Sequence, residues 1–195
     1  MADTPLANLD SIAGREIVVG VTGGIAAYKT AALVSRMVQA GAGITVVMTE
    51  HATRFVGPLT FQTLTGRPVP TDLWQPPEAH RADHIALADR AELVVVAPAT
   101  ANILGKLAAG IADDLISTLL LAVDVPVLVA PAMNVRMWRH PAVQDNVRTL
   151  LARGVHFAGP ADGRLACGDV GVGRMAEPEE ILTEIVKLMG GRPKA

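Results

Sequence analysis

The stretch VTGGIAAYKT, residues 21–30, has the composition of a phosphate-binding turn. Gly23 and Gly24 allow the backbone to approach an anion closely, and free N–H groups at the start of a following helix can hold it. A P-loop is excluded because Tyr28 stands where the second glycine should be, and the stretch also lacks the dinucleotide fingerprint. The pattern favours the single phosphate of a mononucleotide such as FMN. The alternative is that the glycines only permit tight packing of a strand on a helix.

Three further stretches carry side chains suited to chemistry. His84 precedes an I-x-L pattern, which indicates a helix entry, where a histidine can act as a base; the alternative is a surface histidine. Asn134 lies in PAMNVRMW (131–138), and a buried amide there needs partners that a substrate carboxylate could supply. In the same stretch, Met133 and Met137 are four residues apart and would share one face of a helix. Cys167 lies in the glycine-rich loop ACGDVGVGRMAEP, which is suited to closing over a ligand.

Short apolar runs rich in valine alternate with helical patterns along the chain. Such runs are typical of strands buried on both faces of a parallel sheet. The runs cover residues 17–21, 44–48, 93–97 and 125–130, and the helical patterns cover 25–40, 100–122, 141–153 and the stretch from Pro178 to about Gly190. The order predicts one α/β domain, a three-layer, doubly wound and mainly parallel sheet with a core at about residues 15–189 and a tail or linker at 190–195. Residues 67–83 hold four prolines and are expected to form a loop.

Ligands of such sheets bind beyond the carboxyl ends of the strands. Hydroxyl donors follow three of the predicted strands there, namely Thr22, Thr49 and Thr100. These threonines, Asn102 and Asn134 are therefore expected to meet the glycine pair at one edge.

Composition excludes several classes of function. The chain has 195 residues with a net charge of −2 and 3% aromatic residues, which argues against nucleic acid as a partner. Half of the residues are hydrophobic, and the mean hydropathy of +0.36 predicts apolar surface buried between subunits. Charged residues and prolines interrupt the apolar region 93–133, so no membrane span is predicted. The single cysteine excludes an internal disulfide and a multi-cysteine zinc site, and no metal is expected. No secretory signal is visible at the start of the sequence. These features predict a cytoplasmic protein.

Five motifs, in order over residues 15–189, resemble the flavin-dependent cysteine decarboxylases. They are VTGGIAAYK, ADHIAL, PATANILGKLAAGIADDL, PAMNVRMW and ACGDVGVGRMAEP. Within that family the resemblance is greatest to the branch that decarboxylates 4'-phosphopantothenoylcysteine to 4'-phosphopantetheine in coenzyme A synthesis. It implies an FMN whose phosphate lies on the loop after the first strand. The flavin pocket that it implies consists of Gly23, Gly24, Ile25, Thr49, Thr100, Ala101 and Asn102.

The resemblance also implies a redox decarboxylation. The flavin oxidises the cysteinyl CH2–SH of the substrate to a thioaldehyde, with His84 nearby, and CO2 then leaves to give an enethiolate. Reduced flavin returns a hydride while Cys167 supplies the proton. Asn134 is expected to hold the substrate carboxylate, and Met137 is a further expected substrate contact.

Alternatives to this activity stay open at this point. A peptidyl-cysteine decarboxylase stops at the enethiol and does not need the loop cysteine, so Cys167 favours the coenzyme A branch. A flavin-binding regulatory subunit without turnover would not need all the catalytic positions. The resemblance further implies a homotrimer with flavin at the subunit interface, or a dodecamer that is assembled from such trimers. It also implies a phosphopantothenoylcysteine synthetase domain or protein as partner, expected to begin about where GGRPKA ends.

Overall fold

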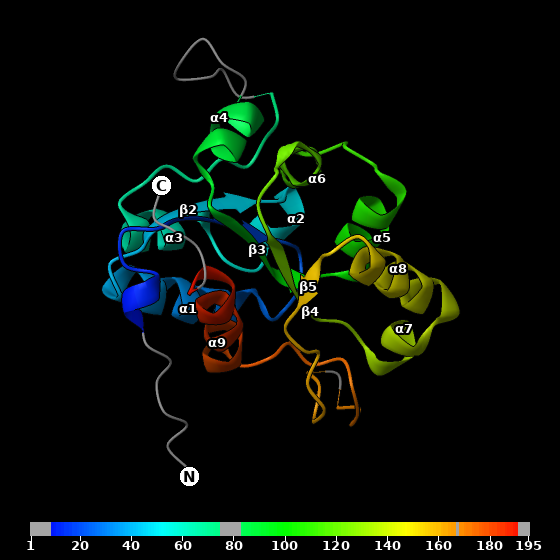
Figure 1. Cartoon of the computed structure of the whole chain (residues 1–195). Coiled ribbons are helices and arrows are strands. Elements are labelled where there is room, and N and C mark those ends of the chain that lie inside the picture. Colours follow the sequence, from blue (N-terminus) through cyan, green and yellow to red (C-terminus); the bar gives the residue numbers. More distant parts are fainter. Residues whose placement is uncertain (1–8, 75–82, 167, 191–195) are drawn as a thin grey trace.

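The computed structural model describes residues 9–74, 83–166 and 168–190 (Figure 1). Its centre is a five-stranded sheet with the strand order β2-β1-β3-β4-β5, and every pairing among these strands is parallel. The strands are β1 (Glu16–Val21), β2 (Gly43–Met48), β3 (Leu93–Ala99), β4 (Val127–Pro131) and β5 (His156–Phe157). The chain places β2 on one side of β1 and β3 on the other, so the direction in which strands are added reverses between β1 and β3. The carboxyl ends of the strands at such a reversal form the usual ligand crevice of doubly wound sheets.

Helices cover both faces of the sheet (Figure 1). The helices are η1 (Leu9–Ser11), α1 (Ala27–Gln39), α2 (Glu50–Thr53), α3 (Pro58–Thr65), α4 (Asp83–Arg90), α5 (Ala101–Ala109), α6 (Leu115–Ala122), α7 (Val135–Arg139), α8 (Pro141–Ala152) and α9 (Pro178–Met189). One core cluster joins α1, α3 and α9 to β1 through side chains such as Ile17 and Val19. The other joins α4, α5, α6 and α8 to the opposite face through Val18. The predicted three-layer architecture is confirmed.

The predicted strands and long helices are present with small shifts of their ends. The pattern over residues 100–122 forms two helices, because Gly110 ends α5 in the left-handed conformation, with a φ of 71°. The sequence analysis missed β5, which has only two residues, and the short helices α2 and α3. Within the expected loop 67–83, residues 75–82 lie outside the described part of the chain. Across the described ranges, no helix combines the length and apolar character needed to cross a membrane.

The expected shared face of Met133 and Met137 is wrong. The helix α7 begins only at Val135, with Asn134 as its N-cap in an extended conformation. Met133 therefore precedes the helix, where it is buried in the core cluster beneath α5 and α8, whereas Met137 is exposed. The reason is that the Asn134 side chain caps the helix, which fixes the helix start one residue later.

Candidate cofactor and substrate site

A cavity of about 1050 Å³ lies at the carboxyl ends of β1, β3 and β4. Its volume is at the upper end of the range for ligand pockets, which is roughly 300–1,000 Å³. The walls come from the segments after the strands and from the hairpin 161–174, which is closed by antiparallel bridges. The expected site residues that the structure brings together here are Gly23, Gly24, Ile25, Thr49, Thr100, Ala101, Asn102, Asn134 and Met137.

The turn between β1 and α1 points unused hydrogen-bond donors at this region. Among the described residues, no acceptor is found for the backbone N–H groups from Gly23 to Ala26. The helix α1 also begins at Ala27 without a side-chain cap. Free N–H groups and the positive end of a helix dipole together attract an anion. The turn therefore has the chemistry of a phosphate site.

The two glycines of this turn have different roles. A Cβ atom on Gly23 would lie 2.4 Å from Cβ of His51, so only glycine lets the turn pack against α2. A Cβ atom on Gly24 would meet no atom closer than 3.7 Å, the distance to Cγ2 of Thr100. The packing interpretation therefore holds for Gly23, whereas the absent side chain of Gly24 leaves open space at the cavity wall.

The three threonines also differ. Thr22 is buried, and its hydroxyl donates to the carbonyl of Pro98 at 2.6 Å while accepting from the N–H of Thr100 at 3.2 Å. Its expected role as a ligand donor is wrong, because this hydroxyl ties β1 to the end of β3. Thr49 accepts from the N–H of Ala52 as the N-cap of α2, which leaves its own O–H to donate. Thr100 makes no side-chain cap bond at the start of α5.

Asn134 is held at both ends of its amide. Its Oδ1 accepts from the N–H of Arg136 at 2.8 Å, and its Nδ2 donates to Oδ2 of Asp169 at 2.9 Å. Asp169 comes from the hairpin, next to Gly168. The amide nitrogen therefore already holds a carboxylate, which is the group that the expected substrate would present.

The hairpin is fastened to the segment that carries Asn134. The N–H of Met133 donates to the carbonyl of Gly173 at 2.9 Å. Gly173 has a φ of 153°, and a Cβ atom there would lie 2.5 Å from the carbonyl oxygen of Met133, so only glycine fits. Cys167 belongs to this hairpin by sequence but lies outside the described residues.

Charged groups line two ends of the cavity. At one end, Lys106 bonds Asp113 at 2.6 Å and Asp114 at 2.7 Å, and Asp114 caps α6 together with Ser117. Burial opposes ionisation of Asp114, but the bonds from Lys106 and Ser117 outweigh it and hold the pKa of this carboxyl below its ordinary value. Burial likewise opposes the charge of Lys106, yet its two carboxylate partners raise the pKa of the amine. At the other end, Lys29 and Arg174 both contact Glu177.

His84 is a predicted site residue that does not lie at the cavity in the structure of the single chain. It lies half-buried in the first turn of α4, as its helix-entry pattern predicts. The helix α4 packs through Leu87 into the core cluster that it shares with α6, and His84 is absent from the cavity wall. His84 therefore does not line the cavity of its own chain.

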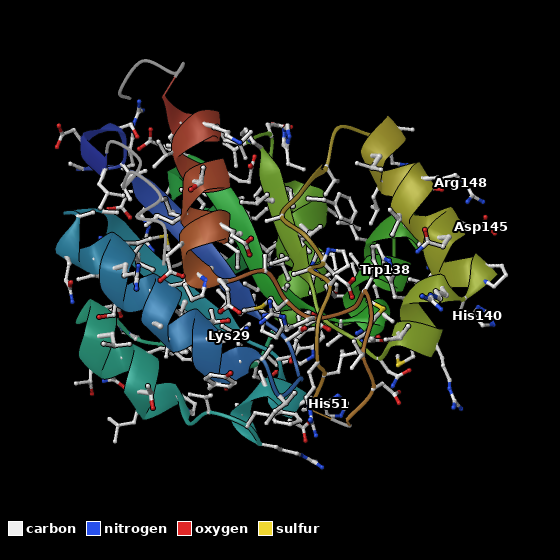
Figure 2. The ribbon with its side chains drawn as sticks, turned by 90° about the horizontal axis from the view of Figure 1, so that it is seen from below. Lys29, His51, Trp138, His140, Asp145 and Arg148 are labelled. Atoms are coloured by element: carbon white, nitrogen blue, oxygen red, sulfur yellow. The ribbon has the colours of Figure 1, made fainter. Side chains whose placement is uncertain are left out.

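Sequence reasoning missed several residues of the cavity wall. Figure 2 shows Lys29 on α1 and His51 on α2, and both line the cavity. His51 follows the carboxyl end of β2 by three residues, which is a signal that the edge rule for parallel sheets provides. Lys29 lies in the first turn of α1, directly after the glycine-containing turn, and that position is a signal as well. No local pattern pointed to Arg174.

The comparisons with known proteins agree with this geometry. The family described as Flavoprotein matches residues 6–190. The chain is 54% identical over 168 residues, 86% of its length, to the coenzyme A biosynthesis bifunctional protein CoaBC of Bacillus subtilis (strain 168), and 48% identical to that of Escherichia coli (strain K12) over 88% of its length. It spans 41% and 42% of these relatives' own lengths, less than half.

Solved structures share the fold along nearly the whole chain. A mutant of PPC decarboxylase complexed with pantothenoylaminoethenethiol has a TM-score of 0.82 and 31% identity, covering 92% of this chain and 100% of that one. The FMN binding protein AtHal3 has the same TM-score and identity, with 92% and 99% covered. The family match over most of the length, together with these likenesses, shows that the chain belongs to the Flavoprotein family.

Proposed function

We propose that this chain is an FMN-dependent decarboxylase that converts 4'-phosphopantothenoylcysteine to 4'-phosphopantetheine in coenzyme A biosynthesis. The observation that carries the proposal is that one cavity is lined by the β1–α1 turn, whose N–H groups have no acceptor among the described residues, and by Asn134, whose amide binds a carboxylate. Support comes from the similarity to coenzyme A biosynthesis bifunctional proteins and to the PPC decarboxylase structure. We propose that residues 15–189 form this one domain and that 190–195 lie outside it.

The residues present fit FMN. The N–H groups from Gly23 to Ala26 suit its phosphate, and Gly24 leaves that approach open. Ile25, Tyr28 and Met137 line the cavity although 59%, 61% and 48% of their surface is exposed in the single chain. Apolar and aromatic walls with a few placed polar groups are typical of cofactor sites. The hydroxyls of Thr49 and Thr100 and the amide of Asn102 are the polar groups that we assign to the flavin, beside Ala101.

When bound, the flavin supplies the oxidation of the substrate thiol and the later return of the electrons. Asn134 binds the substrate carboxylate through Nδ2 once Asp169 has left that atom, and Met137 contacts the substrate from the next turn. The hairpin 161–174 excludes water from the cavity. His84 takes the proton of the substrate in the first step, and Cys167 gives a proton to the product carbon in the last.

We propose that a second copy of the chain completes the site, in a homotrimer or in a dodecamer that is assembled from trimers. This proposal rests on the position of His84 outside the cavity wall and on the exposed apolar side chains at the cavity. Because the similar bifunctional proteins are more than twice as long as the matched segment, we also propose a phosphopantothenoylcysteine synthetase domain or protein as partner. The proposed location is the cytoplasm.

A second candidate is a peptidyl-cysteine decarboxylase. The chain is also similar to the FMN-dependent cysteine decarboxylase SpaF, with a TM-score of 0.78 and 31% identity, so the similarity is not confined to proteins of coenzyme A synthesis. Cys167 distinguishes the two candidates, since an activity that stops at the enethiol does not need it. A flavin-binding regulatory subunit without turnover is the third.

The test combines a spectrum with a substrate choice. We expect the purified protein to be yellow, with noncovalent FMN released by denaturation, and to release CO2 from phosphopantothenoylcysteine. Comparison with a peptide that ends in cysteine separates the two decarboxylases. A protein that stays colourless with added FMN contradicts the cofactor, and a yellow protein without CO2 release from either compound supports the regulatory subunit.

A further inference from the structure

Two cations at the edge of the cavity share one carboxylate oxygen. Nζ of Lys29 lies 2.8 Å from Oε1 of Glu177, and Nη1 of Arg174 lies 2.7 Å from the same atom. The three residues come from different parts of the fold, namely α1, the N-cap of α9 and the end of the hairpin 161–174. Glu177 thus holds two positive charges close together and neutralises one of them.

Lys29 lies in the first turn of α1, which begins at Ala27. Side chains of a helix lean toward its N-terminus, which here adjoins the β1–α1 turn. Lys29 and the turn residues from Gly23 to Ala26 line the same cavity, and Figure 2 shows Lys29 beside the chain that leads to α9. An ammonium group has three donors, and Glu177 is its one acceptor within the described ranges.

Arg174 also has unused donors. Its Nε is buried and has no hydrogen-bond partner among the described residues, which is rare for a buried donor. A Cβ atom on Gly163 would lie 3.3 Å from this Nε, so the guanidinium lies under the hairpin. The carbonyl of Arg174 accepts from the N–H of Ala161 at 2.7 Å, which makes Arg174 part of the base of the hairpin.

The net charge of the side chains in the cavity wall differs between the two ends of the cavity. The positive side chains of the wall are Lys29, Lys106, Arg164 and Arg174, and the negative ones are Glu50 and Asp114. Lys106 is neutralised by Asp113 and Asp114, whereas Lys29 and Arg174 share Glu177 alone. Glu50, the other carboxylate of the wall, pairs with Arg54 at 3.4 Å. The positive charge in excess of Glu177 therefore lies at the α1 end, where the phosphate of the proposed cofactor would bind.

We propose that Lys29 and Arg174 clamp the phosphate of FMN, and that the bound phosphate, through Arg174, fastens the hairpin 161–174 over the cavity. The inference rests on the proposed cofactor and adds two phosphate ligands to it. A phosphate monoester carries nearly two negative charges at neutral pH and accepts several hydrogen bonds, so it can bind both cations while Glu177 keeps its place. The segment that carries Asp169 is thereby tied to the cofactor's phosphate as well as to Asn134.

Riboflavin tests the clamp because it has the same ring system without the phosphate. Flavin-free protein is titrated with FMN and with riboflavin, and the ratio of the two dissociation constants is measured. Arg174→Gln is expected to reduce the preference for FMN over riboflavin roughly 10- to 100-fold, which is the usual contribution of hydrogen bonds to charged groups. The dissociation constant of riboflavin should change little. Lys29→Gln should act in the same direction. Arg36→Gln, which removes a cation of α1 that pairs with Glu179 on α9 outside the cavity wall, is the matched control and should keep the preference within about threefold.

Hydrogen exchange gives a readout that does not depend on turnover. In the wild type, saturating FMN should slow amide exchange over residues 161–174, and saturating riboflavin should not. In Arg174→Gln, FMN should lose this effect even where it is bound. Thermal unfolding of each flavin-free variant identifies general damage to the fold, and Arg174→Lys, which retains the charge, should recover part of the FMN preference.

The outcomes separate the clamp from the cofactor proposal. A wild type that binds neither flavin overturns the cofactor and the clamp with it. A wild type that prefers FMN, beside an Arg174→Gln variant with an unchanged preference, overturns the clamp alone. If FMN and riboflavin slow amide exchange in the hairpin equally, the proposal that the bound phosphate fastens the hairpin is wrong.

Discussion

The side-chain amide of Asn134 donates a hydrogen bond to the carboxylate of Asp169, with 2.9 Å between Nδ2 and Oδ2. Asn134 lies where β4 leads into α7, and Asp169 lies in the hairpin 35 positions further along the chain. The structure therefore shows the amide holding a carboxylate of the protein itself. Under the proposed function, substrate binding exchanges this carboxylate for that of the substrate, and Asp169 is released.

Asn134→Asp should weaken substrate binding at least roughly tenfold, because like charges in a closed site repel. The new carboxylate would face both Asp169 and the substrate. The affinity for phosphopantothenoylcysteine, measured with protein that retains its flavin, checks this. Adding Asp169→Asn should restore the contact with the hairpin without restoring substrate binding. Unchanged binding by Asn134→Asp rules out the carboxylate contact.

The neighbouring glycines should fail in different ways. Gly24→Val should keep the fold but lose FMN, because its side chain enters open space at the phosphate approach. Gly23→Ala should lower the free energy of unfolding by about 1–3 kcal/mol, because its Cβ would overlap His51. Flavin absorbance per protein and denaturant unfolding distinguish the two effects. A fully yellow Gly24→Val variant would place the phosphate elsewhere.

His84→Asn should retain flavin and lower the rate of CO2 release roughly 10²- to 10⁴-fold, the usual effect of losing a positioned base. Because His84 lies outside the cavity of its own chain, mixed oligomers of His84→Asn and Asn134→Asp should recover activity. In such a mixture some sites receive an intact residue from each copy. Turnover of His84→Asn within a few-fold of the wild type would return His84 to the role of a surface histidine.

Cys167→Ser should separate the two halves of the proposed reaction. Oxidation and decarboxylation do not need the thiol, but protonation of the product carbon does, and a hydroxyl is a far weaker acid than a thiol with a pKa of about 8.5. The variant should release CO2 once, keep its flavin reduced and accumulate an enethiol two hydrogens lighter than phosphopantetheine, as mass spectrometry of a single turnover can detect. Normal phosphopantetheine at near the wild-type rate would remove the main support for the coenzyme A activity over the peptide decarboxylases.

Asp114 should make stability depend on pH. Its pKa is lowered in the folded protein, so its contribution is present above the unfolded value of about 4 and is lost as the pH falls through the folded value. Asp114→Asn keeps a good N-cap for α6 but loses the charge toward Lys106, whereas Asp114→Ala also loses the cap, at about 1 kcal/mol. Urea unfolding should show the Asn variant less stable than the wild type near pH 7, with a difference that shrinks as the pH falls below about 4. A difference that does not change with pH contradicts this.

Much of the fold could be predicted because its signals are local. The valine-rich runs indicate four strands. Because parallel strands end at one edge, the sequence predicts that Gly24, Thr49 and Thr100 lie together, and all three line the cavity. Other features depend on contacts that leave no local pattern. Lys29 meets Glu177 across 148 positions of sequence, and the need for glycine at position 23 comes from His51 on another helix. The two-residue strand β5 forms because β4 offers it a free edge.

The exposed apolar side chains Ile25, Tyr28 and Met137 have a consequence for making this protein. A newly synthesised chain that binds neither flavin nor a second copy presents these side chains to water, and exposed apolar surface promotes aggregation. The yield of soluble protein should therefore follow the vitamin supply of the expressing cells, rising with riboflavin in the medium even when the amount of transcript is constant.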